Sequence, residues 1–420
     1  MFDFTLTEEQ LALQRLIRDF IKREIEPVAK EREAIEDPLK RMPWDIIVKL
    51  SKLGIRTLAL KKEYGGAGAD CLTCCIVIEE LSVGELGIST LIAQTLKFTN
   101  YFNKAMNDEQ RARFLPDFVK DDTYLLATGT TEPDTDKGFR YFEPSNLPGT
   151  GVRTHAKRDG KGGWIINGLK HYISTGSDAK LYFIFARTDP TKGGPEGVTV
   201  FIVPRGTPGF TTGRIEDKIG QRLINNAELI FENCRVPDEN ILIGEGEASK
   251  VRNTYTQKSN VEAGATALGA GRAAYEAALD WAKTRVQGGK PIIQHEAIGM
   301  MLADMATSLE AARTLTWKAA WSVDHPKEAQ RYLEDYKCFD PAFDIKKQNS
   351  LTSMAKFFTT EATVEVVIKA MEILGGHGIM RDGPTEKCLR DSVTFLHSDR
   401  TNTMHRLSAA QLIGGYEVRI

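Results

Sequence analysis

Long apolar segments and an excess of charge of either sign are both missing from this chain of 420 residues. No apolar run approaches the roughly 20 residues that a membrane-spanning helix needs. With 55 basic and 57 acidic residues, the formal net charge is −2, which argues against nucleic acid or an anionic membrane as a partner. We therefore expect a protein that binds neither nucleic acid nor a membrane.

Cysteine is also sparse: the chain has six, and only Cys71, Cys74 and Cys75 lie close together. A structural zinc site would need a second pair of ligands at a suitable spacing, and the sequence offers none, so we expect no metal. Scattered cysteines in a long chain are typical of a reducing compartment, and the first residues lack the basic and apolar stretches of a signal peptide. We expect a cytoplasmic protein in which these three cysteines open a helix as small apolar side chains.

Helical periodicity dominates both ends of the chain, whereas strand patterns are concentrated in the middle. Apolar residues recur at helical spacing after the capping sequence Thr7–Gln10, and the alanine- and glycine-rich segment 263–284 suits close helix packing. Segments such as Leu181–Ala186, separated by glycine-containing turns, predict strands. The polar, proline-interrupted segment 324–349 is expected to be irregular. The sequence therefore predicts an α+β protein with an N-terminal helical domain (1–125), a middle β domain (126–240) and a C-terminal helical domain (241–420).

The most informative segment is 390–406, which follows a Gly-Gly pair at 375–376. The two segments together resemble the C-terminal signature of the acyl-CoA dehydrogenase superfamily of flavoproteins, in which a tight turn carries a catalytic glutamate. Here Asp399, one methylene shorter, takes the place of that glutamate, and Arg400 replaces the glycine that follows it. The resemblance covers essentially the whole chain. It implies a β-barrel or sandwich as the middle domain and a four-helix bundle at the C-terminus.

The same resemblance implies FAD as the cofactor, at a site shared between the subunits of a homotetramer or homodimer. Segments 128–133 and 168–176 resemble those at the flavin ring, where an aromatic residue shields the ring and a hydroxyl bonds its N5. Arg285 takes the position that the family uses against the pyrophosphate, which suits the forked guanidinium. The FAD-binding residues implied by the resemblance are Thr128, Thr130, Thr131, Tyr172, Ser174, Arg285, Gln287, Glu372, Gly375, Gly376, Thr401 and Thr403.

Asp399 is the predicted catalytic base. A desolvated carboxylate has a raised pKa and can remove the weakly acidic α-proton of a thioester, while the flavin accepts a hydride from the β-carbon. The resemblance thus implies dehydrogenation of an acyl-CoA, with an electron-transferring flavoprotein as the natural electron acceptor. Without the resemblance to this family, we would interpret Asp399 as the N-cap of a helix that starts near Thr401. The second base position used in the family falls on Ser259. Glu262, one helical turn further, is an alternative base that could point into the same pocket and ranks below Asp399, but we expect it to pair with a buried arginine instead.

Several positions that contact the substrate in the family differ in this chain. Lys137 stands where the family has a serine, and Asn260 stands where it has an arginine. A longer loop occupies residues 138–151. We assign Lys137, Asn260 and Arg400 to substrate binding, and the differences point to an unusual acyl group, such as a branched or cyclic one, or to a substrate without CoA. Nitroalkane oxidases of the same superfamily use an aspartate at the base position, so oxidation of a nitroalkane by O2 is the alternative. An inactive scaffold on the same fold is a third hypothesis, because fold alone does not fix function.

Overall fold

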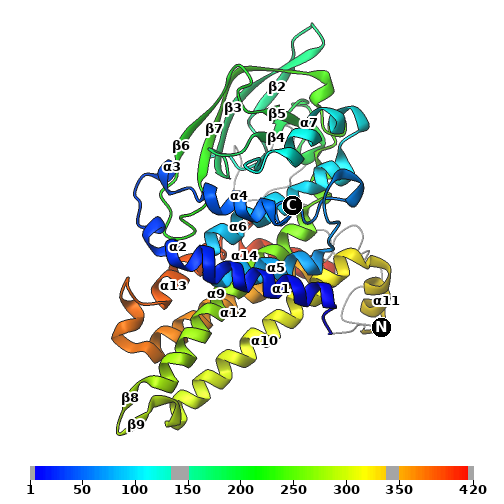
Figure 1. The fold of residues 1–420 in the computed structure, drawn as a ribbon. Coiled ribbons are helices and arrows are strands. Elements are labelled where there is room, and N and C mark those ends of the chain that lie inside the picture. Colours follow the sequence, from blue (N-terminus) through cyan, green and yellow to red (C-terminus); the bar gives the residue numbers. More distant parts are fainter. Residues whose placement is uncertain (1–4, 134–150, 337–349, 415–420) are drawn as a thin grey trace.

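The structure, a computed structural model, describes residues 5–133, 151–336 and 350–414. A β-sheet lies at one end of the molecule, and the long helices α9, α10 and α12 run away from it toward a small hairpin at the opposite end (Figure 1). The N-terminal helices lie across the region where the sheet meets these long helices (Figure 1). None of the helices in the described ranges offers an apolar stretch that could span a bilayer.

The N-terminal helices begin at capping residues that the sequence provides. Thr7 Oγ1 accepts a hydrogen bond from the Gln10 N–H, and the Gln10 side chain accepts one from the Thr7 N–H, which confirms the predicted start of the first helix. Asp70 and Glu85 cap two later helices with their carboxylates. The helices are α1 (Glu8–Phe20), α2 (Glu26–Glu33), α3 (Pro38–Arg41), α4 (Trp44–Lys52), α5 (Cys71–Gly84), α6 (Leu86–Asn100) and α7 (Asp108–Lys120).

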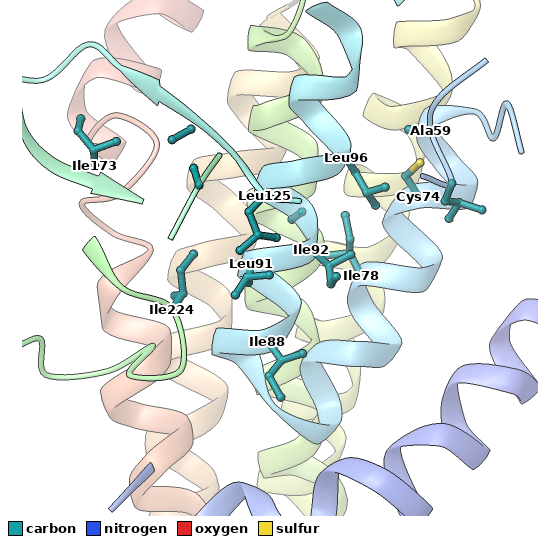
Figure 2. Packing of buried hydrophobic residues seen from close by; sticks show 14 of the residues in the cluster. Ala59, Cys74, Ile78, Ile88, Leu91, Ile92, Leu96, Leu125, Ile173 and Ile224 are labelled. Carbon is teal, nitrogen blue, oxygen red and sulfur yellow. The ribbon is translucent and has the colours of Figure 1, made fainter. Parts of the chain in front are cut away.

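Helix α6 is buried along its whole length. Ile88, Ile92 and Leu96 of α6 belong to the same buried cluster as Ile78 of α5 (Figure 2). Cys74 lies in this cluster as a small apolar side chain, which confirms the expectation for the start of α5. Because close-packed neighbours surround α6, its side chains are held in fixed positions.

The middle part is a curled seven-stranded sheet with the order β1-β4-β2-β3-β7-β6, in which β5 pairs with β4. Strand β4 is buried at every position. Its sequence is therefore almost continuously apolar rather than alternating. The pairing of β3 with β7 shifts register between Lys170 and Ile173, and Tyr172 within this bulge has φ +60°. The strands are β1 (Leu126–Gly129), β2 (His155–Arg158), β3 (Gly163–Ser174), β4 (Leu181–Arg187), β5 (Val198–Pro204), β6 (Phe210–Ile215) and β7 (Asn226–Pro237).

The C-terminal part is built on three long helices that pack together. Gly269 allows one of them to approach α5 closely, because a Cβ at this position would lie 2.4 Å from the carbonyl oxygen of Glu79. A short hairpin, β8 (Val286–Gln287) and β9 (Lys290–Pro291), follows the first long helix. The helices are α8 (Ala248–Asn253), α9 (Thr256–Thr284), α10 (Glu296–Asp324), α11 (Pro326–Tyr336), α12 (Ser350–Leu374), α13 (Thr385–Thr394) and α14 (Asn402–Gly414).

The expectation that segment 324–349 is irregular is wrong for its first part. Residues Pro326–Tyr336 form helix α11, and residues 337–349 lie outside the described residues. The proline stands at the first position of the helix, where its missing N–H costs no hydrogen bond. Ala329 and Leu333, four residues apart, are both buried on one face of α11. Two apolar residues in a polar segment were too weak a signal to predict this helix.

Candidate active site

Asp399 lies in the turn between α13 and α14. Asp399 and Arg400 both have left-handed backbone conformations, with φ +49° and +72°. Two such residues in succession cost free energy unless the surroundings hold them. The ammonium group of Lys356, on α12, holds this turn by donating hydrogen bonds to Phe395 O at 2.7 Å, Arg400 O at 2.9 Å and Asn402 Oδ1 at 2.8 Å.

His405 fixes the backbone of the same turn from the other side. Burial lowers the pKa of its imidazole to about 4, so the ring is neutral at pH 7. Its Nε2 lies 2.9 Å from Asp399 O, and since a carbonyl only accepts, Nε2 carries the proton and donates. Nδ1 is then the acceptor for the Ser353 hydroxyl at 3.3 Å. The turn that carries Asp399 is therefore held by two buried side chains, Lys356 and His405.

The two oxygens of the Asp399 carboxylate have different environments. Oδ1 accepts hydrogen bonds from Lys97 Nζ of α6 at 2.9 Å and from Ser259 Oγ of α9 at 3.1 Å. Oδ2 accepts no hydrogen bond from any residue that the structure describes. Burial acts to raise the pKa of Asp399, but the Lys97 ammonium, with help from Lys356 and Ser259, outweighs the desolvation and holds the pKa below its usual range. In this state the carboxylate is ionised, and Oδ2 is its open oxygen.

Two aromatic residues, the buried Tyr101 and the half-buried Tyr255, lie next to the predicted flavin-edge residues. The Tyr101 hydroxyl lies 3.1 Å from Thr128 Oγ1, and its ring packs edge-on against Tyr255, with ring centroids 5.7 Å apart. Thr130 lies near the Tyr255 hydroxyl and acts to lower its pKa. Burial raises the pKa of Tyr255, and the nearby negative charge of Asp399 raises it further. Thr128 and Thr130 therefore lie on the same side of the molecule as Asp399.

The other residues predicted at the flavin ring gather at the bulge of β3. Tyr172 is 56% exposed, although it sits on a strand of the central sheet, and its ring stacks on His171 at 3.8 Å. Asn226 Nδ2 donates to Tyr172 O at 2.9 Å and to Ser174 Oγ at 3.2 Å. The carbonyl of Thr131 accepts from His171 N at 2.9 Å. The arrangement presents an aromatic ring and the Ser174 hydroxyl at the C-terminal end of β3, a strand in the interior of the sheet.

The remaining predicted cofactor residues lie at the opposite end of the long helices. Arg285 follows the last residue of α9, and the 26 residues that separate it from Ser259 span about 40 Å at the rise of an α-helix. Its guanidinium lies 5.8 Å from the ring of Trp281, which stacks on His377. The predicted residues at this end, all exposed, are Arg285, Gln287, Glu372, Gly375 and Gly376. One chain alone therefore does not bring the twelve predicted FAD residues together.

Three further predictions concern the residues around the turn. Thr401 Oγ1 accepts from Met404 N at 3.4 Å, so Thr401, rather than Asp399, caps α14; Thr403 is exposed on the first turn of that helix. Asn260, predicted to bind substrate, is buried and donates to Thr352 Oγ1 at 3.1 Å. Arg400 is exposed beside Asp399, whereas Lys137 lies outside the described residues.

The expectation that Glu262 pairs with a buried arginine is wrong. Glu262 is 1% exposed, and neither of its oxygens has a hydrogen-bond partner among the described residues. The arginine of the same helix, Arg272, instead bonds Glu79 at 2.9 Å and Glu80, because it lies two to three turns away, against α5. Burial raises the pKa of Glu262 to about 8, although the charges of Lys258 and Lys97 oppose this shift.

The sequence reasoning missed Lys97, Lys356, Tyr101, Tyr255 and His405. One signal was available for Lys97, since it is the only charged residue in the fifteen-residue sequence of α6. A lone charge in an apolar helix indicates a buried partner or a function. The other four residues occur in sequences that give no comparable signal.

The fold agrees with the comparisons. Three family descriptions match: "Acyl-CoA dehydrogenase, N-terminal domain" over residues 7–122, the middle domain over 127–234 and the C-terminal domain over 257–413. The chain belongs to the acyl-CoA dehydrogenase family. Its prediction as a member of this superfamily, with the fold of the family, is confirmed.

Individual relatives cover the chain almost completely. An acyl-CoA dehydrogenase of Bacillus subtilis (strain 168) is 34% identical over 98% of this chain and 99% of its own length. A cyclohex-1-ene-1-carbonyl-CoA dehydrogenase of Geobacter metallireducens is 34% identical over 96% and 97%, respectively. The solved structure of butyryl-CoA dehydrogenase from Megasphaera elsdenii superposes with a TM-score of 0.84 at 30% identity, over 97% of this chain and 99% of that one. The chain is an oxidoreductase of this family.

Proposed function

We propose that the enzyme removes two hydrogens from the α- and β-carbons of an acyl-CoA, with Asp399 as the base. The observation that carries this proposal is the asymmetric carboxylate: Oδ1 is anchored by Lys97 and Ser259, while Oδ2 accepts no hydrogen bond within the described residues. The N–H of Asp399 likewise has no acceptor there, although the turn is firmly held. An open basic oxygen and an open N–H on one residue suit a proton to be removed and a carbonyl to be polarised.

FAD is the cofactor of this family, and the described residues fit it. Tyr172 keeps a half-exposed ring on a strand, which suits the wall of a flat ring system, and Thr130, Thr131 and Ser174 present polar groups near it. When bound, FAD supplies a hydride acceptor. We assign Thr128 and these four residues to the flavin ring, and Thr401 and Thr403 to the same end of the cofactor.

In the proposed step, Asp399 Oδ2 takes the α-proton and its negative charge is neutralised. The carbanion-like density that forms on the thioester is stabilised by the Asp399 N–H at the carbonyl oxygen. The electron pair left on the α-carbon would form the double bond to the β-carbon, for which FAD, held by Thr128, Thr130, Thr131, Tyr172 and Ser174, would supply the hydride acceptor. His405 and Lys356 contribute by keeping the N–H and the carboxylate in place, since misplacement of about 1 Å can cost ~10²-fold in rate.

The exposed residues at the far end of the long helices are best explained by a second subunit. We assign Arg285, Gln287, Glu372, Gly375 and Gly376 to an FAD bound mainly by a neighbouring chain of a homotetramer or homodimer. The open space beside Gly375 and Gly376, where an added Cβ would meet no atom within 4 Å, leaves room for a ligand or backbone from outside the chain. An electron-transferring flavoprotein is the proposed acceptor of the electrons.

A nitroalkane is the second candidate substrate, and one observation favours it. Lys97 lowers the pKa of Asp399, and a weaker base suits the more acidic α-carbon of a nitroalkane. In that reaction O2 would reoxidise the flavin. Asn260, Arg400 and Lys137 are the residues that we propose to contact either substrate.

The deciding experiment is anaerobic mixing of the purified holoenzyme with straight, branched, cyclic and carboxylated acyl-CoAs, and with a small nitroalkane, while the flavin absorbance is followed. We expect the absorbance to bleach with at least one acyl-CoA. Bleaching by the nitroalkane alone would replace the proposed function with the oxidase, and a protein that binds no flavin would contradict both.

A further inference from the structure

Lys97 is an unusual neighbour for the base. Its side chain is 4% exposed, and α6 brings no other charge with it. Two of its N–H groups are used, on Asp399 Oδ1 at 2.9 Å and on Ser259 Oγ at 3.1 Å, and Nζ lies 5.2 Å from the Phe98 ring. The described residues offer no further acceptor, so one ammonium N–H remains available. Burial of a lysine is costly, which makes a role for this charge worth seeking.

The contact between Lys97 and Asp399 opposes the chemistry of a base. An ammonium 2.9 Å from a carboxylate oxygen stabilises the ionised form and makes the carboxylate a poor acceptor for a weakly acidic proton. Lys356 is already committed to the carbonyls of Phe395 and Arg400, so it does not change when Lys97 moves. Removing the Lys97 charge from Asp399 would leave a desolvated carboxylate without a direct cationic partner. This is the state in which a carboxylate is most basic.

The surroundings of Lys97 contain a second group that lacks a partner. Glu262, on α9 one turn after Ser259, is 1% exposed with neither oxygen hydrogen-bonded among the described residues. Ser259, one turn before it, is hydrogen-bonded to both Lys97 and Asp399, and the charges of these two residues act on the pKa of Glu262. In its protonated form Glu262 is an O–H donor, so the ammonium of Lys97 and the carboxyl of Glu262 can both donate to one anionic oxygen group.

We propose that Lys97 recognises a carboxylate on the acyl group and leaves Asp399 to bind it, so that only a substrate with this group frees the base. The substrates are then CoA thioesters of dicarboxylic acids, with Glu262 as the second donor to the distal carboxylate. This inference rests on the proposed function and adds the substrate class. In the absence of such a substrate, Lys97 stays on Asp399 and keeps the enzyme slow toward uncharged acyl groups.

The first test uses the wild-type holoenzyme alone. Glutaryl-CoA, pentanoyl-CoA and 4-aminobutyryl-CoA present an anionic, a neutral and a cationic end on chains of similar length. We expect glutaryl-CoA to reduce the flavin roughly 10- to 100-fold faster than pentanoyl-CoA, as for one charge-assisted interaction in a buried site. Equal rates would overturn the inference and keep the proposed function. A preference for 4-aminobutyryl-CoA would also overturn it, since Glu262 would then be the anion that binds a cationic group.

The second test removes the charge of Lys97 with little change in volume. In Lys97→Met we expect pentanoyl-CoA to reduce the flavin faster than in wild type and glutaryl-CoA to do so more slowly. The acid limb of the rate against pH should shift to higher pH, because Asp399 then faces Ser259, Glu262, Lys356 and His405 without the direct ammonium. The Lys250→Met variant, at an exposed lysine of α8 paired with Glu247, should behave as wild type.

The Lys97→Met variant also shows whether Lys97 binds the substrate carboxylate or only holds Asp399 in place. Flavin content and the visible spectrum report whether Lys97→Met folds. If it retains FAD but loses the reduction by both substrates, Lys97 only holds Asp399 in place and the inference is refuted. If it does not fold, the wild-type substrate comparison decides. If none of the acyl-CoAs bleaches the flavin of the wild type, it is the proposed function that fails.

Discussion

The two ends of helix α9 are built in opposite ways. Near Ser259, residues of α6, α9, α12 and the turn before α14 surround Asp399, and Lys97, Ser259 and Asp399 are hydrogen-bonded to one another. Near Arg285, the predicted functional residues are exposed and face open space. This contrast agrees with our proposal that one chain supplies the base, whereas a neighbouring subunit helps to hold the cofactor.

The largest expected effect is on the rate of flavin reduction and comes from Asp399, at the Ser259 end of α9. Asp399→Asn keeps the size and the contacts of the side chain but removes the base, so we expect the rate of flavin reduction to fall by roughly 10²- to 10⁴-fold. FAD content should stay unchanged, because Asp399 does not hold the cofactor in our assignment. Stopped-flow absorbance under anaerobic conditions measures the first quantity and the visible spectrum the second. Normal reduction in this variant would refute Asp399 as the base.

A second prediction tests the buried charge at the same end through the pH dependence of stability. The pKa of Glu262 is raised to about 8 by burial, above the value in the unfolded chain, so the folded state binds the proton more tightly. Its stabilising effect is complete below the unfolded pKa and is lost as pH rises through about 8. Glu262→Gln should therefore gain about 4 kcal/mol relative to wild type between pH 5 and 9. Urea denaturation at several pH values measures it.

The exposed Glu328 on α11 provides the matched control for this experiment. Glu328→Gln should show no pH-dependent difference from wild type over the same range. A constant offset between Glu262→Gln and wild type at all pH values would mean that Glu262 is ionised throughout and has a partner outside the described residues.

The sequence predicted the residues around Asp399 only where the signal comes from residues close together in the chain. Cap and strand signals, as at Thr7 and in β4, involve neighbouring residues and were read correctly, and Asp399 was found because its segment resembles a known family. Lys97 and Ser259 reach Asp399 across 302 and 140 positions, so no local pattern reports their contacts. Glu262 was assigned to an arginine because helical spacing gives the face of a residue but not its partner.

The third prediction tests the Arg285 end of α9. Arg285→Ala should weaken FAD binding by roughly 10- to 30-fold, the loss expected for charge-assisted hydrogen bonds to phosphate. The substitution should leave the pH dependence described for Glu262 unchanged, because the two residues lie at opposite ends of α9. Fluorescence titration of the apoprotein with FAD measures the affinity.

Mixing subunits sharpens this prediction. Hybrids of Asp399→Asn and Arg285→Ala subunits contain sites with an intact base from one chain and an intact arginine from the other. If the far end serves a neighbouring site, the mixture should regain activity that neither parent shows at limiting FAD. Activity that stays at the level of the two parents would place Arg285 in its own subunit's site, or in no site at all.

The smallest expected effect comes from Gly376→Ala, which tests whether a cofactor or a partner subunit approaches this glycine. Within one chain a Cβ at Gly376 meets no atom within 4 Å, so Gly376→Ala should change the free energy of unfolding of the apoprotein by at most about 0.5 kcal/mol. If a cofactor or a partner backbone approaches this glycine, the same methyl group should lower FAD affinity a few-fold, as the titration would show. Gly299→Ala in α10, where the added Cβ would meet only Ile293 O at 3.8 Å, is the control and should leave the affinity unchanged. Equal FAD affinity in both variants would mean that the far end faces solvent, and the contrast between the two ends of α9 would then reflect exposure alone.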